Sequence, residues 1–184
     1  MPYKQLSKND ILRALNRLGE LAQAKGVVLE LALYGGAVFT VVYGSRDSTK
    51  DVDAVARPSS LAQQLARKVA GEQGLPEDWL NEDVRQFLAG VEEKRRLAST
   101  DIGPGLVVSV PTAAYLLALK VNACRAPLPG YAGDQDDILF LVRKMRIKSF
   151  AEVEAVYKRF FPNDEIPEAH RAVIQALVET AGRS

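Results

Sequence analysis

The chain contains almost no residues capable of sulfur or imidazole chemistry. Among its 184 residues there is one cysteine, Cys124, and one histidine, His170. A disulfide framework is therefore excluded, and zinc sites or catalytic triads built on Cys and His are strongly disfavoured. The chemistry of any site must come from carboxylates, lysines, arginines and backbone amides.

Long apolar runs and a strong charge of one sign are also missing. No window approaches the roughly 20 apolar residues of a membrane-spanning helix, and the first residues lack the apolar core of a signal peptide. The formal net charge is +1, so no overall basic field indicates coating of nucleic acid. Hydrophobic residues make up 47% of the chain, which is ordinary for a globular protein. We expect a cytoplasmic protein with no membrane partner.

The order of periodic segments predicts an α/β (α+β) fold with a small mixed sheet and a helical C-terminal half. We expect a core over 1–110 and a helical region over 111–184 that completes the active site. Expected helices cover 7–24, 37–43, 60–71, 81–87, 111–125, 134–145, 150–161 and 167–181. Expected strands cover 27–34, 51–56, 97–100 and 106–110, and 44–50 is expected to be a loop. Ser7 is predicted to cap the first helix and Pro111 to open the helix after the last strand.

Two aspartates stand in one expected strand, although aspartate is depleted in strands. Asp51 and Asp53 are two residues apart, so their side chains share a face and their Cα atoms lie about 7 Å apart. Such carboxylates can converge on Mg²⁺ or Mn²⁺, which accept one or two carboxylates together with substrate phosphates. The alternative is an exposed strand end with ion pairs to Lys50 or Arg57.

A glycine pair lies between the first strand and the following helix. Gly35 and Gly36 allow backbone amides to approach a ligand closely, and a helix N-terminus favours phosphate. A plain tight turn is the alternative interpretation. Because the loop with Arg46 and Thr49 leads directly into the strand of Asp51 and Asp53, phosphate and metal could meet at one site.

The stretch Tyr34–Val55, with its Gly-Gly pair, its Arg and Ser/Thr loop and its Asp-Val-Asp, resembles the signature of DNA polymerase β-like nucleotidyltransferases. Within that superfamily it is most similar to minimal enzymes related to the AbiE-type toxins of toxin–antitoxin systems. A second block, Leu116–Leu141, resembles the family's lysine-bearing helix followed by an acidic helix start. The resemblance implies these site residues: Gly35, Gly36, Arg46, Ser48, Thr49 and Arg125 for the nucleotide, Asp51 and Asp53 for the metal, and Lys120, Asp134 and Asp137 for catalysis. One departure is that the strand 106–110 lacks the third carboxylate that such enzymes usually carry on a later strand.

By this resemblance the protein would transfer a nucleoside monophosphate from a nucleoside triphosphate to a hydroxyl of RNA or protein. Asp134 or Asp137 would hold a second metal or accept the proton, and Lys120 would stabilise the leaving group. The alternatives are a nucleotide-binding pseudoenzyme and a partner-binding protein such as one half of a toxin–antitoxin pair with an antitoxin partner. Lys120 and Arg125 could also be a solvated helix edge, and Asp134, Asp136 and Asp137 a helix cap. The basic residues Arg143, Lys144, Arg146 and Lys148 could bind RNA or complement the helix dipole.

Overall fold

The computed structural model describes residues 5–98, 102–128 and 133–183, and it divides into two compact units. The first unit contains the chain before Phe87 together with Lys94–Val110. The second contains Phe87–Glu93 and the chain from Pro111 onward. The expected α+β class is confirmed, since a mixed sheet occupies one part and helices the other.

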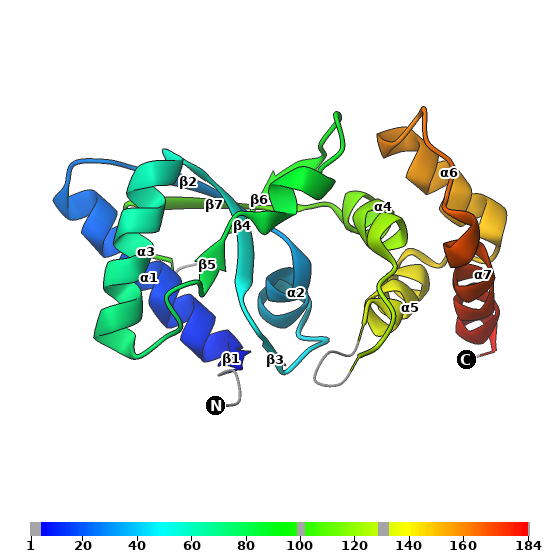
Figure 1. Ribbon diagram of the computed structural model, residues 1–184, viewed down its shortest axis with the longest axis horizontal. Coiled ribbons are helices and arrows are strands. Elements are labelled where there is room, and N and C mark those ends of the chain that lie inside the picture. Colours follow the sequence, from blue (N-terminus) through cyan, green and yellow to red (C-terminus); the bar gives the residue numbers. More distant parts are fainter. Residues whose placement is uncertain (1–4, 99–101, 129–132, 184) are drawn as a thin grey trace. The chain divides into compact units, whose positions relative to one another are not determined.

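A five-stranded mixed sheet forms the first unit, in the order β5-β4-β2-β7-β6 (Figure 1). The central strand β2 (Leu29–Leu33) pairs antiparallel with β4 (Val52–Arg57) and parallel with β7 (Leu106–Pro111). Strand β5 (Leu80–Asn81) pairs parallel with β4, and β6 (Lys94–Arg96) borders β7 at the other edge. Between β2 and β4 the chain forms α2 (Gly35–Val38), a π-helical turn η1 (Phe39–Tyr43) and β3 (Ser48–Thr49).

The two faces of this sheet differ in burial, and the strand sequences explain why. Along β4, Val52, Ala54 and Ala56 are buried, whereas Asp53 and Val55 on the alternate face are half-exposed. Two helices, α1 (Lys8–Ala24) and α3 (Ser59–Gln73), pack side by side, and α3 packs on β4. The apolar residues of one sheet face and of these two helices therefore build the core, and the other face keeps polar side chains.

Local signals account for the first helix and for a small second sheet. Ser7 caps α1 by accepting the Asp10 amide hydrogen, and the Asp10 side chain accepts the Ser7 amide hydrogen in return. Strand β1 (Leu6–Ser7) pairs antiparallel with β3, so that Thr49 lies opposite Leu6. This pairing holds one end of the loop that leads to β4.

Helices form the second unit: α4 (Ala113–Ala123), α5 (Gln135–Met145), α6 (Phe150–Phe160) and α7 (Glu168–Gly182). Helix α4 packs on α5 and α6, and α7 packs on α5 and α6. The rings of Tyr115 and Phe160 pack in a tilted arrangement within this core, and the Tyr157 hydroxyl donates to Asn122 Oδ1. In the described part of the chain, no helix combines the length and the apolar character that crossing a membrane requires.

Several sequence predictions need correction. The edge strand is Lys94–Arg96 rather than 97–100, because its three cations hide the alternation that marks a strand; residues 99 and 100 of that prediction lie outside the described residues. Pro111 ends β7 instead of opening a helix, and Thr112 caps α4 by accepting the Tyr115 amide hydrogen. Part of the expected loop 44–50 is β3. The segment after Asn81 is a 3-10 helix, η2 (Asp83–Phe87), preceded by β5.

Candidate functional site

The glycine pair lies at the end of β2, directly against the aspartate strand. Gly35 has φ 56, a left-handed value that favours glycine. A Cβ at Gly35 would lie 2.5 Å from Oδ2 of Asp53, and the Tyr34 amide donates to the Asp53 carbonyl at 2.8 Å. Only a residue without a side chain therefore lets the backbone turn this close to the carboxylate.

Gly36 makes a similar approach to the loop before β4. A Cβ at Gly36 would overlap Oγ1 of Thr49 and would lie 3.6 Å from Nη1 of Arg46. The Arg46 guanidinium also lies over the Phe39 ring, 5.8 Å from its centroid. Thr49 is buried, and its neighbour Ser48 is half-exposed. The structure thus brings Gly36, Arg46 and Thr49 together, as the sequence analysis expected of a phosphate site.

The two aspartates lie at the start of β4. Asp53 is on the strand, and Asp51 immediately precedes its first residue. The alternation of half-exposed and buried side chains runs from Asp51 through Ala56, which assigns both aspartates to the polar face. Because β2 and β4 are antiparallel, this end of β4 meets the end of β2 from which Gly35 departs.

The chemistry of these residues fits a divalent cation. Asp51 and Asp53 supply the hard oxygen donors that Mg²⁺ prefers, and the backbone at Gly35 packs closely against the Asp53 carboxylate. No cluster of three or more His, Cys, Asp or Glu side chains suited to a metal occurs among the described residues. Two carboxylates are nevertheless a usual protein share for Mg²⁺, since substrate phosphates and water supply the other ligands.

The second block of predicted residues forms a buried ionic cluster in the helical unit. Lys120 Nζ lies 2.6 Å from Asp134 Oδ1 and 2.8 Å from Asp137 Oδ2. The Arg125 side chain donates to both oxygens of Asp134, through Nε at 2.9 Å and Nη2 at 3.2 Å, and its amide donates as well. Lys120, Asp134 and Asp137 have side-chain exposures of 5%, 0% and 2%, whereas Arg125 is 59% exposed. Two cations and two carboxylates thus balance one another at the junction of α4 and α5.

The electrostatics of this cluster keep Asp134 charged. Burial alone would raise the pKa of its carboxyl, but hydrogen bonds from Arg125 and the charge of Lys120 outweigh it and hold the pKa well below its usual range. A carboxylate with so low a pKa is a weak proton acceptor. The geometry therefore suits Asp134 to holding Lys120 and Arg125 in place, and neither predicted helix-edge cation is a simple solvated lysine or arginine.

Two residues beside the aspartates were missed as site residues by the sequence analysis. Asn81 is paired in register with Asp53 on the neighbouring strand, so its side chain lies on the same sheet face. Its side chain also accepts the Asp83 amide hydrogen at the start of η2. A strand of two residues leaves no periodic signal that could have revealed its position beside Asp53.

Glu82, next in the chain, ties β4 to the start of α3. Its carboxylate accepts from the Ala56 amide at 2.9 Å, from the Ser59 hydroxyl at 2.6 Å and from Arg85 at 2.7 Å. Burial would raise its pKa, but the hydrogen bonds from Arg85 and Ser59 lower it to about 2. No sequence signal pointed to this acid, because its partners on β4 and α3 come more than twenty positions earlier.

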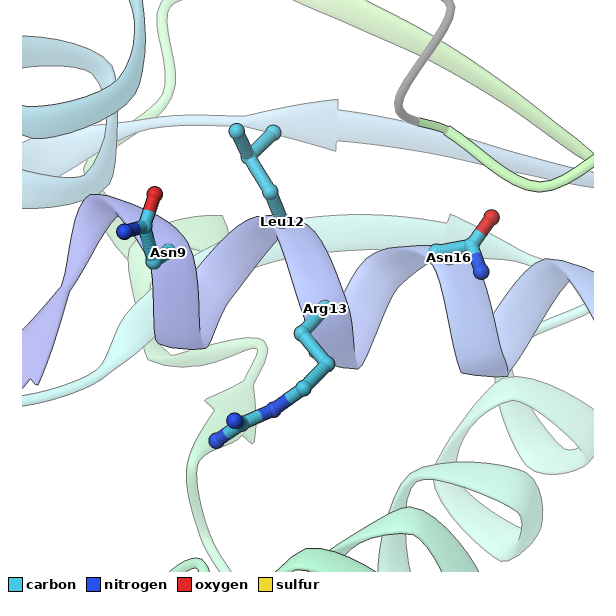
Figure 2. A pocket seen from close by; sticks show the side chains of 4 residues that line it. All are labelled: Asn9, Leu12, Arg13 and Asn16. Atoms are coloured by element: carbon cyan, nitrogen blue, oxygen red, sulfur yellow. The ribbon is translucent and has the colours of Figure 1, made fainter.

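Two surface hollows lie in or near the first unit's helices. Figure 2 shows one on α1, about 480 Å³ in volume and lined by Asn9, Leu12, Arg13 and Asn16. Its lining comes from a single helix and includes none of the predicted site residues. A second, of about 450 Å³, is lined by Asn81 together with Gln63, Arg67, Glu77, Asp78, Leu80, Glu82 and Asp83. It borders the strand next to Asp53 and is the hollow closer to the predicted chemistry.

Comparison with known proteins adds no relative to this geometry. No protein-family model matches the chain, and neither the curated proteins nor the solved structures contain a match. The site must therefore be interpreted from its own residues.

Proposed function

We propose that this protein is a metal-dependent nucleotidyltransferase that moves a nucleoside monophosphate from a nucleoside triphosphate to an acceptor hydroxyl. The observation that supports this most is the close approach of the glycine backbone to the aspartate strand and its loop. Gly35 lies against the Asp53 carboxylate, and Gly36 lies against Thr49. A triphosphate needs hydrogen-bond donors for its oxygens on one side and a metal on the other. Where β2 ends and β4 begins, the first unit has candidate residues for both.

The residues of the first unit divide the binding work. The amides of Gly35 and Gly36 would bind phosphate oxygens, together with Arg46, Ser48 and Thr49; Arg46 and Thr49 lie next to Gly36. Asp51 and Asp53 would hold Mg²⁺ or Mn²⁺, which when bound supplies positive charge to the phosphates. These side chains orient the triphosphate for in-line attack, which is the main task of a protein in phosphoryl chemistry.

The transfer itself is a displacement at the α-phosphorus. The acceptor oxygen forms a bond to that phosphorus, the bond from phosphorus to the bridging oxygen breaks, and pyrophosphate leaves with the electron pair. The hydroxyl proton passes to a base. The resemblance assigns proton transfer to Asp134 or Asp137 and the leaving group to Lys120, and these roles stay predictions.

Thermal unfolding with each of the four common nucleoside triphosphates, with and without Mg²⁺ or Mn²⁺, tests the proposal. A ligand at 100 times its dissociation constant raises the free energy of unfolding by about 2.7 kcal/mol. We expect a shift that needs nucleotide and metal together and that is lost in Asp51→Asn/Asp53→Asn. Asp78→Asn, an exposed acid of the same unit, is the matched control and should keep the shift. No shift for the unmodified protein would refute the proposal.

One observation favours a second candidate, a nucleotide-binding module without turnover. Neither strand that could carry a third carboxylate has one, since β7 lacks an acid and the residue registered beside Asp53 is Asn81, a neutral amide. Release of pyrophosphate in the presence of RNA or protein acceptors separates the two candidates. A metal-dependent thermal shift without pyrophosphate release would identify the binding module.

A further inference from the structure

The polar face of the sheet continues from Asp53 to the opposite edge of the first unit. Two hydrogen bonds, Leu97 amide to Val108 carbonyl and Thr112 amide to Glu93 carbonyl, establish an antiparallel register between β6 and β7. Both strands have the same number of residues between these two bonds, so the pairing contains no bulge and Arg96 lies opposite Ser109.

That register connects Arg96 to the aspartate strand in a single row. Ser109 pairs with Ala32 of β2, and Ala32 pairs with Val55 of β4. Directly paired residues share a face, so Arg96, Ser109, Ala32 and Val55 all lie on the face of Asp53. Three strand spacings of about 4.8 Å put the β6 edge about 14 Å from β4.

The side chains along this row are small, and positively charged side chains lie at the β6 edge. Ala32, Val55 and Ser109 are small, and Val55 and Ser109 are half-exposed. Lys94 and Arg96, two residues apart on β6, share this face and are exposed. Glu30 of β2, an exposed acid on this face beyond the row, is paired in register with Arg57 of β4.

We propose that Lys94 and Arg96 bind the phosphate backbone of a single-stranded RNA acceptor whose terminal hydroxyl reaches the site at Asp53. This inference rests on the proposed function and names its acceptor. RNA supplies in one molecule the phosphates that two cations can bind and, a few nucleotides away, the hydroxyl that the transfer consumes. Cations on an edge strand also discourage pairing with another sheet, and that role alone would leave RNA binding unaffected by their removal.

The test is the affinity for a fluorescently labelled short RNA of mixed sequence, followed by anisotropy over a series of salt concentrations and without nucleotide or metal. Lys94→Gln/Arg96→Gln should bind at least tenfold more weakly than the unmodified protein. Its slope of log affinity against log salt should be smaller by about 1.4, since each phosphate contact on single strands contributes about 0.7. Arg67→Gln/Lys68→Gln, exposed cations of α3, makes the same change in net charge and should bind as the unmodified protein does.

Three results would overturn the inference. They are no RNA binding by the unmodified protein at low salt, an equal loss in the α3 control, and displacement of RNA by poly-glutamate as effective as by unlabelled RNA. The thermal shift with nucleotide and metal, measured on the same variants, separates this inference from the proposed function. Retained RNA binding without any nucleotide shift would refute the nucleotidyltransferase and leave the RNA-binding face standing. Size-exclusion chromatography of Lys94→Gln/Arg96→Gln detects self-association. Self-association of this variant is the outcome expected if the two cations only keep the β6 edge from pairing with another sheet.

Discussion

Replacing Lys120 by methionine tests the ionic cluster most directly. The side chain is 5% exposed and forms ion pairs with two carboxylates that are 0% and 2% exposed. Methionine keeps most of the aliphatic volume, so the change mainly removes the charge. Breaking a buried ion pair by removing one partner costs about 3–5 kcal/mol, because the remaining charge stays buried. We expect the lower part of this range, since Arg125 still contacts Asp134.

The expected loss corresponds to a fall in melting temperature of about 10 °C for a chain of this size. Far-UV circular dichroism during urea unfolding follows the helices of both units, whereas the single tryptophan, Trp79, reports on the first. Lys148→Met, an exposed lysine of the helical unit, is the control and should change the free energy of unfolding by no more than about 0.5 kcal/mol.

A second substitution in the same variant gives a further check. Asp137→Asn in the Lys120→Met background should recover part of the lost stability at neutral pH. A loss below about 1 kcal/mol at neutral pH, or no recovery on adding Asp137→Asn, would refute the account of the cluster as a tightly coupled ionic group.

Three further predictions concern the first unit. Glu82→Gln should lower the free energy of unfolding by about 2 kcal/mol at neutral pH, allowing for solvent screening. Because the pKa of Glu82 is lowered to about 2, its contribution to stability is present above about pH 4.5 and is lost as the pH falls toward 2. Urea unfolding of the variant should therefore show a flatter pH dependence over that window. Gly36→Ala should abolish the thermal shift with nucleotide and metal, since its methyl group would overlap Thr49, while Gly71→Ala, which meets no atom within 4 Å, should keep it. Ser7→Ala should lower the free energy of unfolding by about 1 kcal/mol through loss of the α1 cap, and an unchanged urea midpoint would contradict the capping geometry.

Helices and buried strands were predictable because their signals are local. Ser7 and the apolar spacing after it specify α1, and alternating residues specify β4. The edge strand Lys94–Arg96 was misplaced because an edge needs no buried face, so charge replaces alternation. Strands of two residues, such as Ser48–Thr49, exist only through pairing with a distant segment and leave no local pattern.

The candidate site shows the same division between local and distant information. Gly35 follows the end of β2 and Asp53 lies near the start of β4, and antiparallel pairing of these strands brings the two ends together, so their contact follows from topology. Asn81 and Arg96 reach the same face only through the order in which strands assemble, which no window of sequence contains.

Charge balance explains why the acidic residues of α5 differ in what they can do. Both Asp134 oxygens accept from Arg125, and Oδ1 also accepts from Lys120, so the carboxylate is stabilised in its charged form. A proton acceptor needs a pKa near the operating pH, which this arrangement opposes. The sequence predicts an acidic residue at the start of α5, but only the structure shows that Asp134 accepts hydrogen bonds from both Lys120 and Arg125. Asp134 therefore acts by holding Lys120 and Arg125 in position, and a catalytic role for Asp137 stays a prediction.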